Sequence, residues 1–225
     1  MLTLPLHDLP TRCASGFIIR YILPRTLPPA LVGPIDRKAI FDYSLGGGEL
    51  LVGAGHGSPS LFCGHNNQVL LSANALPSSI KQKVIFLVSC ETGQELGPAL
   101  VAAGAQSYIG FKEDLVWILD GDKWPVPWSD KLGGLTMKPI VACMNSILDG
   151  NTVQTAFDTM LAGMQESIDQ TDDELVKASL QYNLKNAVLL GDGGTKIRPT
   201  PHFTTPIPPP PILIPADLTS HFSPS

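Results

Sequence analysis

The sequence predicts an α/β domain in which a mostly parallel β-sheet carries helices on both faces. Three short apolar runs bounded by glycine or polar residues have the composition of buried parallel strands, and they cover residues 49–54, 84–89 and 106–111. A helical segment over 94–103 separates the second and third runs, which makes a strand–helix–strand crossover. With 44% hydrophobic and 16% charged residues, the composition is that of a globular protein.

Further elements flank this central unit. Before it, β-forming residues over 16–23 predict a strand. After it, apolar residues at three- and four-residue steps predict helices over 140–148 and 153–168, the second capped by Asn151 or Thr152. A third helix over 172–184 leads into a last strand over 187–190.

Proline content divides the chain into three parts. Residues 1–35 form a proline-rich amino-terminal segment that holds the predicted strand, residues 36–195 form the domain, and residues 196–225 form a proline-rich tail. Such a tail favours extended polyproline conformations over packed structure. We interpret it as a linker or a strap on the domain rather than as a ligand for a proline-binding partner.

Charge and composition exclude several classes of function. The net charge is −5 and the 15 basic residues are scattered, so we expect no direct nucleic-acid partner. Neither a membrane-spanning run nor a secretory signal is found, which predicts a cytoplasmic protein that does not bind membranes. The four cysteines lack the spacing of a disulfide framework. Cys63 and His65 have no second ligand pair, so we expect neither a metal nor a cofactor.

Two residues with catalytic chemistry stand at predicted strand ends. His56 lies between Gly55 and Gly57 after the first strand, and Cys90 follows the second strand and precedes a helix. The carboxyl ends of parallel strands meet at one edge of a sheet, where ligands bind. A nearby helix start would lower the pKa of the thiol. A thiol and an imidazole at neighbouring strand ends are what covalent acyl transfer requires.

These motifs carry a family resemblance. Gly55-His56-Gly57, then Ser89-Cys90-Glu91-Thr92-Gly93, then Ala102-Ala103-Gly104-Ala105 with a strand, resemble the CHAT domain of the caspase and gingipain clan of cysteine peptidases. The ending Asn186-Ala187-Val188-Leu189-Leu190-Gly191-Asp192 resembles the closing strand of gingipain-like and CHAT domains. The resemblance implies a three-layer caspase-like fold. The sequence departs from the pattern at Ser89, at Gly193 and after the third strand, where the usual tryptophan-containing stretch is replaced.

The resemblance also implies a mechanism. His56 would act as base or acid, Cys90 would attack the scissile carbonyl of a protein or peptide substrate, and the amides of Gly57 and Cys90 would form the oxyanion hole. Charged groups in loops select the substrate in this clan, and the candidates include Asp36, Arg37 and Asp42. The tentative substrate-binding residues are Glu91, Glu113, Asp114 and Asp120.

Two alternative functions stay open from the sequence. One is a catalytically silent caspase-like interaction domain, and the other is a thiol amidase or acyltransferase that acts on a small molecule. If the chain is a peptidase, we expect a regulatory protein partner or cleavage of the long loop over 112–134 to control it.

Overall fold

A mostly parallel sheet forms the centre of the computed structural model, which describes residues 1–26, 29–123 and 125–200. Within these residues the sheet has six strands in the order β2-β1-β3-β7-β8-β9. All neighbouring strands are parallel except β8 and β9, which are antiparallel. The strands are β1 (Leu2–Leu4), β2 (Ala30–Val32), β3 (Leu50–Ala54), β7 (Val84–Val88), β8 (Ser107–Phe111) and β9 (Ala187–Gly191).

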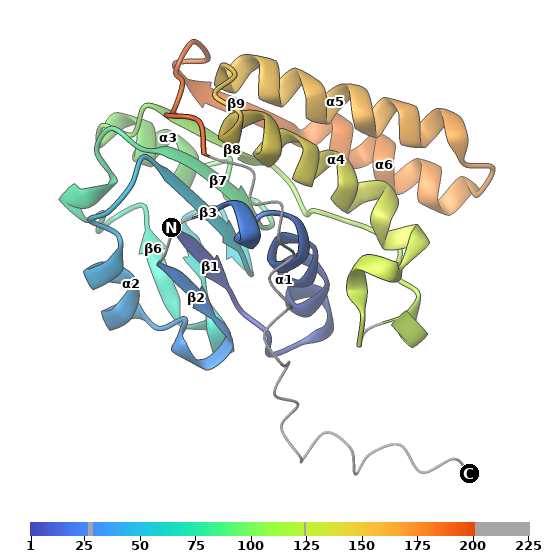
Figure 1. Ribbon diagram of the computed structural model, residues 1–225, viewed down its shortest axis with the longest axis horizontal. Coiled ribbons are helices and arrows are strands. Elements are labelled where there is room, and N and C mark those ends of the chain that lie inside the picture. Colours follow the sequence, from blue (N-terminus) through green and yellow to red (C-terminus); the bar gives the residue numbers. More distant parts are fainter. Residues whose placement is uncertain (27–28, 124, 201–225) are drawn as a thin grey trace.

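Helices cover both faces of this sheet, as predicted (Figure 1). On one face lie α1 (Leu9–Tyr21), α4 (Lys131–Leu148) and α5 (Val153–Gln170), with α6 (Glu174–Asn186) packed against α5. On the other face lie α2 (Lys38–Ser44), α3 (Leu96–Ala102) and a small antiparallel sheet of β4 (Gly57–Ser58), β5 (Leu61–Cys63) and β6 (Val69–Ser72). The result is the three-layer arrangement of the caspase-like fold.

Alternating side chains of the central strands fill two separate cores. Val52 and Phe86 point into the core beneath α1, α4 and α5, whereas Leu51 and Ile85 point into the core beneath α2 and α3. All four are fully buried. Each such burial stabilises the fold by about 1.5–3 kcal/mol. Because both faces are buried, the strands read as continuous apolar runs, which is why the sequence predicted them correctly.

The predicted strand over 16–23 is wrong, because residues 16–21 belong to helix α1. Asp8 is the N-cap and forms a capping box with Thr11, and Pro10 stands in the first turn. Cys13, Phe17 and the neighbouring apolar residues then share one buried helical face. β1 and β2 supply strands from the amino-terminal segment instead, so this segment contributes to the same sheet and core.

The later predicted elements are present, with shifted ends. α4 begins at Lys131, well before the predicted start at 140, because Asp130 caps it by accepting hydrogen bonds from the Leu132 and Gly133 amides. Pro139 lies inside the helix. Thr152 caps α5 by accepting a hydrogen bond from the Thr155 amide. At the start of the predicted tail, Ile197 is buried and the Thr200 amide donates to Leu148 O. Residues 201–225 lie outside the described residues. Among the described helices, none has the length and apolarity to cross a membrane.

Asp36, one of the charges that the sequence offered for substrate selection, is buried beside β1. Thr3 Oγ1 donates to its Oδ1 at 2.5 Å, and Oδ2 has no hydrogen-bond partner among the described residues. Burial raises the pKa of Asp36 to about 6, against the lowering effect of hydrogen bonds from Thr3 and the His65 backbone. Asp36 is therefore a structural group and does not face a substrate.

The raised pKa of Asp36 predicts a loss of stability as the pH rises from about 4 to about 6. Between the unfolded value of 3.8 and the folded value of about 6, the folded chain keeps a proton that the unfolded chain releases. A shift of this size corresponds to about 3 kcal/mol. Asp36→Asn should remove this decline in urea unfolding free energies measured between pH 4 and pH 7. Asp42→Asn, on the exposed surface of α2, should keep the decline of stability with pH. If the unfolding free energy changes with pH by the same amount in both variants, Asp36 is not the cause of the decline.

Candidate active site

His56 is held at the carboxyl end of β3 by backbone hydrogen bonds on both sides. The Gly55 amide donates to Val88 O at 3.2 Å, and the Cys63 amide donates to His56 O at 2.9 Å. Gly55 permits this close approach, because a Cβ at that position would lie 2.2 Å from Cys63 O. The histidine is thereby fixed between the central sheet and the small sheet.

Cys90 lies in a tight turn directly after β7. The Thr92 amide donates to Cys90 O at 2.7 Å, and Glu91 adopts a left-handed backbone with φ 57°. Thr92 is buried, where its hydroxyl contacts Ser89 Oγ and accepts a hydrogen bond from Tyr108 Oη, each at 2.8 Å. These bonds attach the turn to the sheet and fix the backbone that presents the thiol.

The two turns meet at Gly57. A Cβ on this residue would lie 2.3 Å from Cys90 O, so the backbones are in contact. His56 and Cys90 consequently line one pocket of about 180 Å³. The other lining residues come from α1, the strand ends and the loop after β8, and they are Pro10, Thr11, Ala14, Gly55, Val88, Ser89, Leu115 and Trp117.

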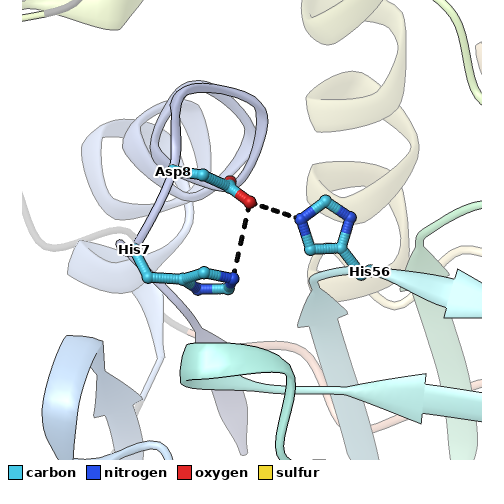
Figure 2. A group of neighbouring side chains, drawn as sticks. All are labelled: His7, Asp8 and His56. Carbon is cyan, nitrogen blue, oxygen red and sulfur yellow. Dashed lines mark hydrogen bonds and ion pairs between the residues drawn. The ribbon is translucent and has the colours of Figure 1, made fainter.

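Asp8 is a member of this site that the sequence analysis missed. Its Oδ2 lies 2.5 Å from His56 Nε2 (Figure 2). Its Oδ1 accepts hydrogen bonds from the amide and the hydroxyl of Thr11. Burial raises the pKa of Asp8, but the hydrogen bonds from His56 and Thr11 outweigh it and the pKa is lowered overall. Asp8 before Pro10 is a helix-start pattern, so the sequence held a signal for α1 but none for the contact with His56.

The structure corrects the expected state of the Cys90 thiol. Helix α3 begins only at Leu96, so Cys90 is not at a helix start. Burial raises the pKa of Cys90; a hydrogen bond from the Leu115 backbone lowers it, while Asp114, which accepts a hydrogen bond from the thiol, and Glu91 raise it further. The thiol is therefore kept protonated in the unliganded protein.

Three of the four tentative substrate-binding residues gather near Cys90. Asp114 and Glu91 act on the thiol, and the Glu91 amide donates to Glu113 O at 3.0 Å. All three carboxylates raise the pKa of Tyr182 on α6. The fourth residue, Asp120, lines a different hollow with Leu9, Lys123 and Asp130, where its carboxylate accepts a hydrogen bond from the Asp122 amide.

The other cysteines occupy different environments, and all four are free thiols. Cys13 and Cys143 are buried in the core, and burial raises the pKa of Cys13 to about 12. Cys63 is half-buried and lines a second hollow of about 300 Å³ together with His56, and burial raises the pKa of Cys63 also. Cys63 is thus the rival thiol near the histidine.

A comparison with solved structures supports the fold. No protein-family model matches the sequence, and no curated protein matches it either. A solved complex of the pro- and mature domains of RgpB from Porphyromonas gingivalis matches with a TM-score of 0.52 and 15% identity. The match covers 84% of this chain and 43% of that chain, so this chain spans less than half of its neighbour's length. RgpB is a gingipain, and the likeness shows the caspase-like fold that the sequence motifs predicted.

Asp114→Asn should make Cys90 more reactive. The substitution removes a negative charge and a hydrogen-bond acceptor that favour the protonated thiol, so the thiolate fraction at pH 7 should rise. We expect Cys90 to be alkylated by iodoacetamide several-fold faster than in the unmodified protein, as measured by mass mapping over a pH series. Asp120→Asn is the matched control and should leave the alkylation rate of Cys90 unchanged. Identical profiles for the two variants, or fastest alkylation at Cys63, would contradict this description of the site.

Proposed function

We propose that this protein is a cysteine peptidase in which Cys90 is the nucleophile, His56 the general base and Asp8 the residue that positions His56. The shared pocket of Cys90 and His56, with Asp8 hydrogen-bonded to the imidazole, is the observation that carries the proposal. The caspase-like fold supports it, since His56 and Cys90 occupy neighbouring strand ends where that fold binds ligands. RgpB adds support at the level of fold.

The proposed reaction starts from the hydrogen bond between Asp8 and His56. Asp8 accepts a hydrogen bond from Nε2–H of His56, which leaves the lone pair of Nδ1 to take the proton of the Cys90 thiol. The thiolate attacks the scissile carbonyl, and the amides of Gly57 and Cys90 stabilise the oxyanion. Nδ1–H then protonates the leaving amine as the C–N bond breaks. Water, deprotonated by Nδ1, hydrolyses the thioester and restores the thiol.

The acidic surroundings of Cys90 favour a basic substrate. Glu91, Glu113 and Asp114 would attract an arginine or lysine side chain before the scissile bond. The same carboxylates oppose ionisation of the thiol, so a bound cation would lower the pKa of Cys90 while it binds. Substrate binding and activation of the nucleophile would then be coupled.

A fluorogenic peptide panel tests the function. Peptides with Arg or Lys before the scissile bond should be cleaved faster than those with Asp, Asn, Leu or Met, and Cys90→Ala should abolish cleavage. Asp114→Asn should reduce the difference in cleavage rate between Arg and Leu peptides, whereas Asp120→Asn should leave that difference unchanged. Absence of turnover across the panel would favour the silent interaction domain, and turnover of small amides alone would favour the amidase.

Control of the peptidase is part of the proposal. Residues 121–123 of the loop after β8 are exposed, which suits cleavage by another protease. Farther along this loop, Pro127 packs against Gly16 of α1, so the loop touches the helix that Asp8 caps. On the same peptide panel, protein nicked in this loop should turn over faster than intact protein. A separate regulatory partner, when added to the intact protein, should have the same effect. Full turnover by the intact isolated chain would exclude such control.

Asp8→Asn tests the positioning role. Asparagine is also a good N-cap, so α1 should persist, while the loss of charge beside His56 should lower kcat on the order of 10²-fold or more. KM should stay nearly unchanged, because Asp8 does not line the pocket. Asp173→Asn, at the N-cap of α6, is the matched control for a purely structural effect. A fall in melting temperature with unchanged kcat would assign Asp8 to folding alone.

A further inference from the structure

A cluster of two histidines and one carboxylate lies at the edge of the proposed active site. One ligand atom each from His7, Asp8 and His56 falls within 4.8 Å of the others, as Figure 2 shows. His7 Nε2 is 3.4 Å from Asp8 Oδ2, which also contacts His56 Nε2. Two imidazoles and one carboxylate are a common protein ligand set for catalytic zinc, with a position left open for water.

His7 is the member of this cluster that the proposed peptidase mechanism does not use. Its side chain is 12% exposed, and neither ring nitrogen has a hydrogen-bond partner among the described residues. Apart from the 3.4 Å contact of Nε2 with Asp8 Oδ2, the ring nitrogens are buried without a hydrogen bond, which costs free energy, and metal coordination is one way to recover it. His7 therefore has the chemistry of a metal ligand.

The surrounding structure holds the carboxylate ready for a ligand. Asp8 Oδ1 is engaged by Thr11 at the start of α1, so only Oδ2 faces the two histidines. The side chains of Asp8 and His56 are 35% and 41% exposed, which leaves an entry path from solvent. A tetrahedral ion with bonds of about 2.0–2.2 Å would need ligand atoms roughly 3.3 Å apart. His7 and Asp8 already have that spacing. His56 Nε2 would have to move away from Asp8 by less than about 1 Å, and the ligand atoms of the two histidines, which lie within 4.8 Å, would have to reach the same spacing.

The type of ion follows from the ligands. Ca²⁺ and Mg²⁺ need several oxygen ligands, and Asp8 is the single carboxylate of the cluster. Imidazole nitrogen favours zinc.

We propose that His7, Asp8 and His56 form a Zn²⁺ site that competes with catalysis. The bound ion would take His56 Nε2 and Asp8 Oδ2, so the hydrogen bond that positions the imidazole would be lost. Binding of the ion does not depend on the proposed function, whereas the inhibitory effect rests on it. Zinc would then hold the enzyme inactive until the ion is removed.

Binding is tested on the Cys90→Ala protein, so that peptidase activity plays no part. Co²⁺ titration should give visible absorption of a nitrogen and oxygen site at one ion per chain, and Zn²⁺ should displace it. His7→Ala and His56→Gln should each weaken binding on the order of 100-fold or more, since even outer-shell changes cost 10- to 100-fold. Far-UV circular dichroism verifies folding. Two variants are used so that misfolding of one leaves the test intact.

Control variants exclude other ligands. His202→Ala with His221→Ala removes the two histidines that lie outside the described residues, and Cys63→Ser removes the nearby thiol. Both proteins should bind Co²⁺ as before. If the two control variants abolish binding, or if Co²⁺ gives no saturable site, the proposal is overturned. Thiolate charge-transfer bands that appear with Cys90 present and vanish in Cys90→Ala would place the metal on the thiol and overturn it also.

The inhibitory effect is tested separately on the active enzyme. Zinc should inhibit peptide cleavage reversibly, with recovery after a chelator. For each protein, half-inhibition is defined against its own rate without zinc. The zinc concentration that gives half-inhibition should be at least tenfold higher for His7→Gln than for the unmodified protein. Stimulation by zinc would overturn the inhibitory role. If no peptide is cleaved at all, the proposed function fails, while the Co²⁺ titration still decides the metal site.

Discussion

The two oxygens of Asp8 join the start of a helix to the histidine of the site. Oδ1 caps α1 through Thr11, and Oδ2 contacts His56 Nε2. Helix formation and imidazole orientation therefore depend on a single carboxylate. The cap fixes the side-chain rotamer, so Asp8 loses little additional entropy when it binds His56. This interaction also requires β1 to lie beside β3, because β1 brings the start of α1 to the carboxyl end of the sheet.

Close backbone contact is the second constraint on the site. Gly57 touches the carbonyl of Cys90, and Gly55 touches that of Cys63, at distances that no Cβ could occupy. Glu91 in its left-handed conformation costs on the order of 1–3 kcal/mol, which the buried hydrogen bonds of Thr92 help to offset. A strained turn on a rigid sheet holds a nucleophile more firmly than a mobile loop would.

The sequence predicts the features that depend on local pattern. Apolar runs identified the central strands, and the motifs around His56 and Cys90 placed both residues at strand ends, where they share a pocket. The contact between Asp8 and His56 joins residues 48 positions apart, and no local pattern encodes it. The segment over 16–23 was assigned to a strand because Phe17, Ile18 and Ile19 suit strands as well as buried helices. The capping box at Asp8 distinguishes the two structures.

The electrostatics of the thiol could not be predicted from chain position. Cys90 follows a strand and precedes a helix in the sequence, but the turn through Glu91 and Thr92 separates it from α3. Burial and Asp114 then favour the protonated thiol. In the proposed enzyme this arrangement has a physical consequence. An unliganded thiol of raised pKa resists oxidation and stray alkylation, since both proceed through the thiolate. A cationic substrate that neutralises Asp114 would reduce that protection at the moment of catalysis, so the same carboxylate would contribute to both selectivity and reactivity.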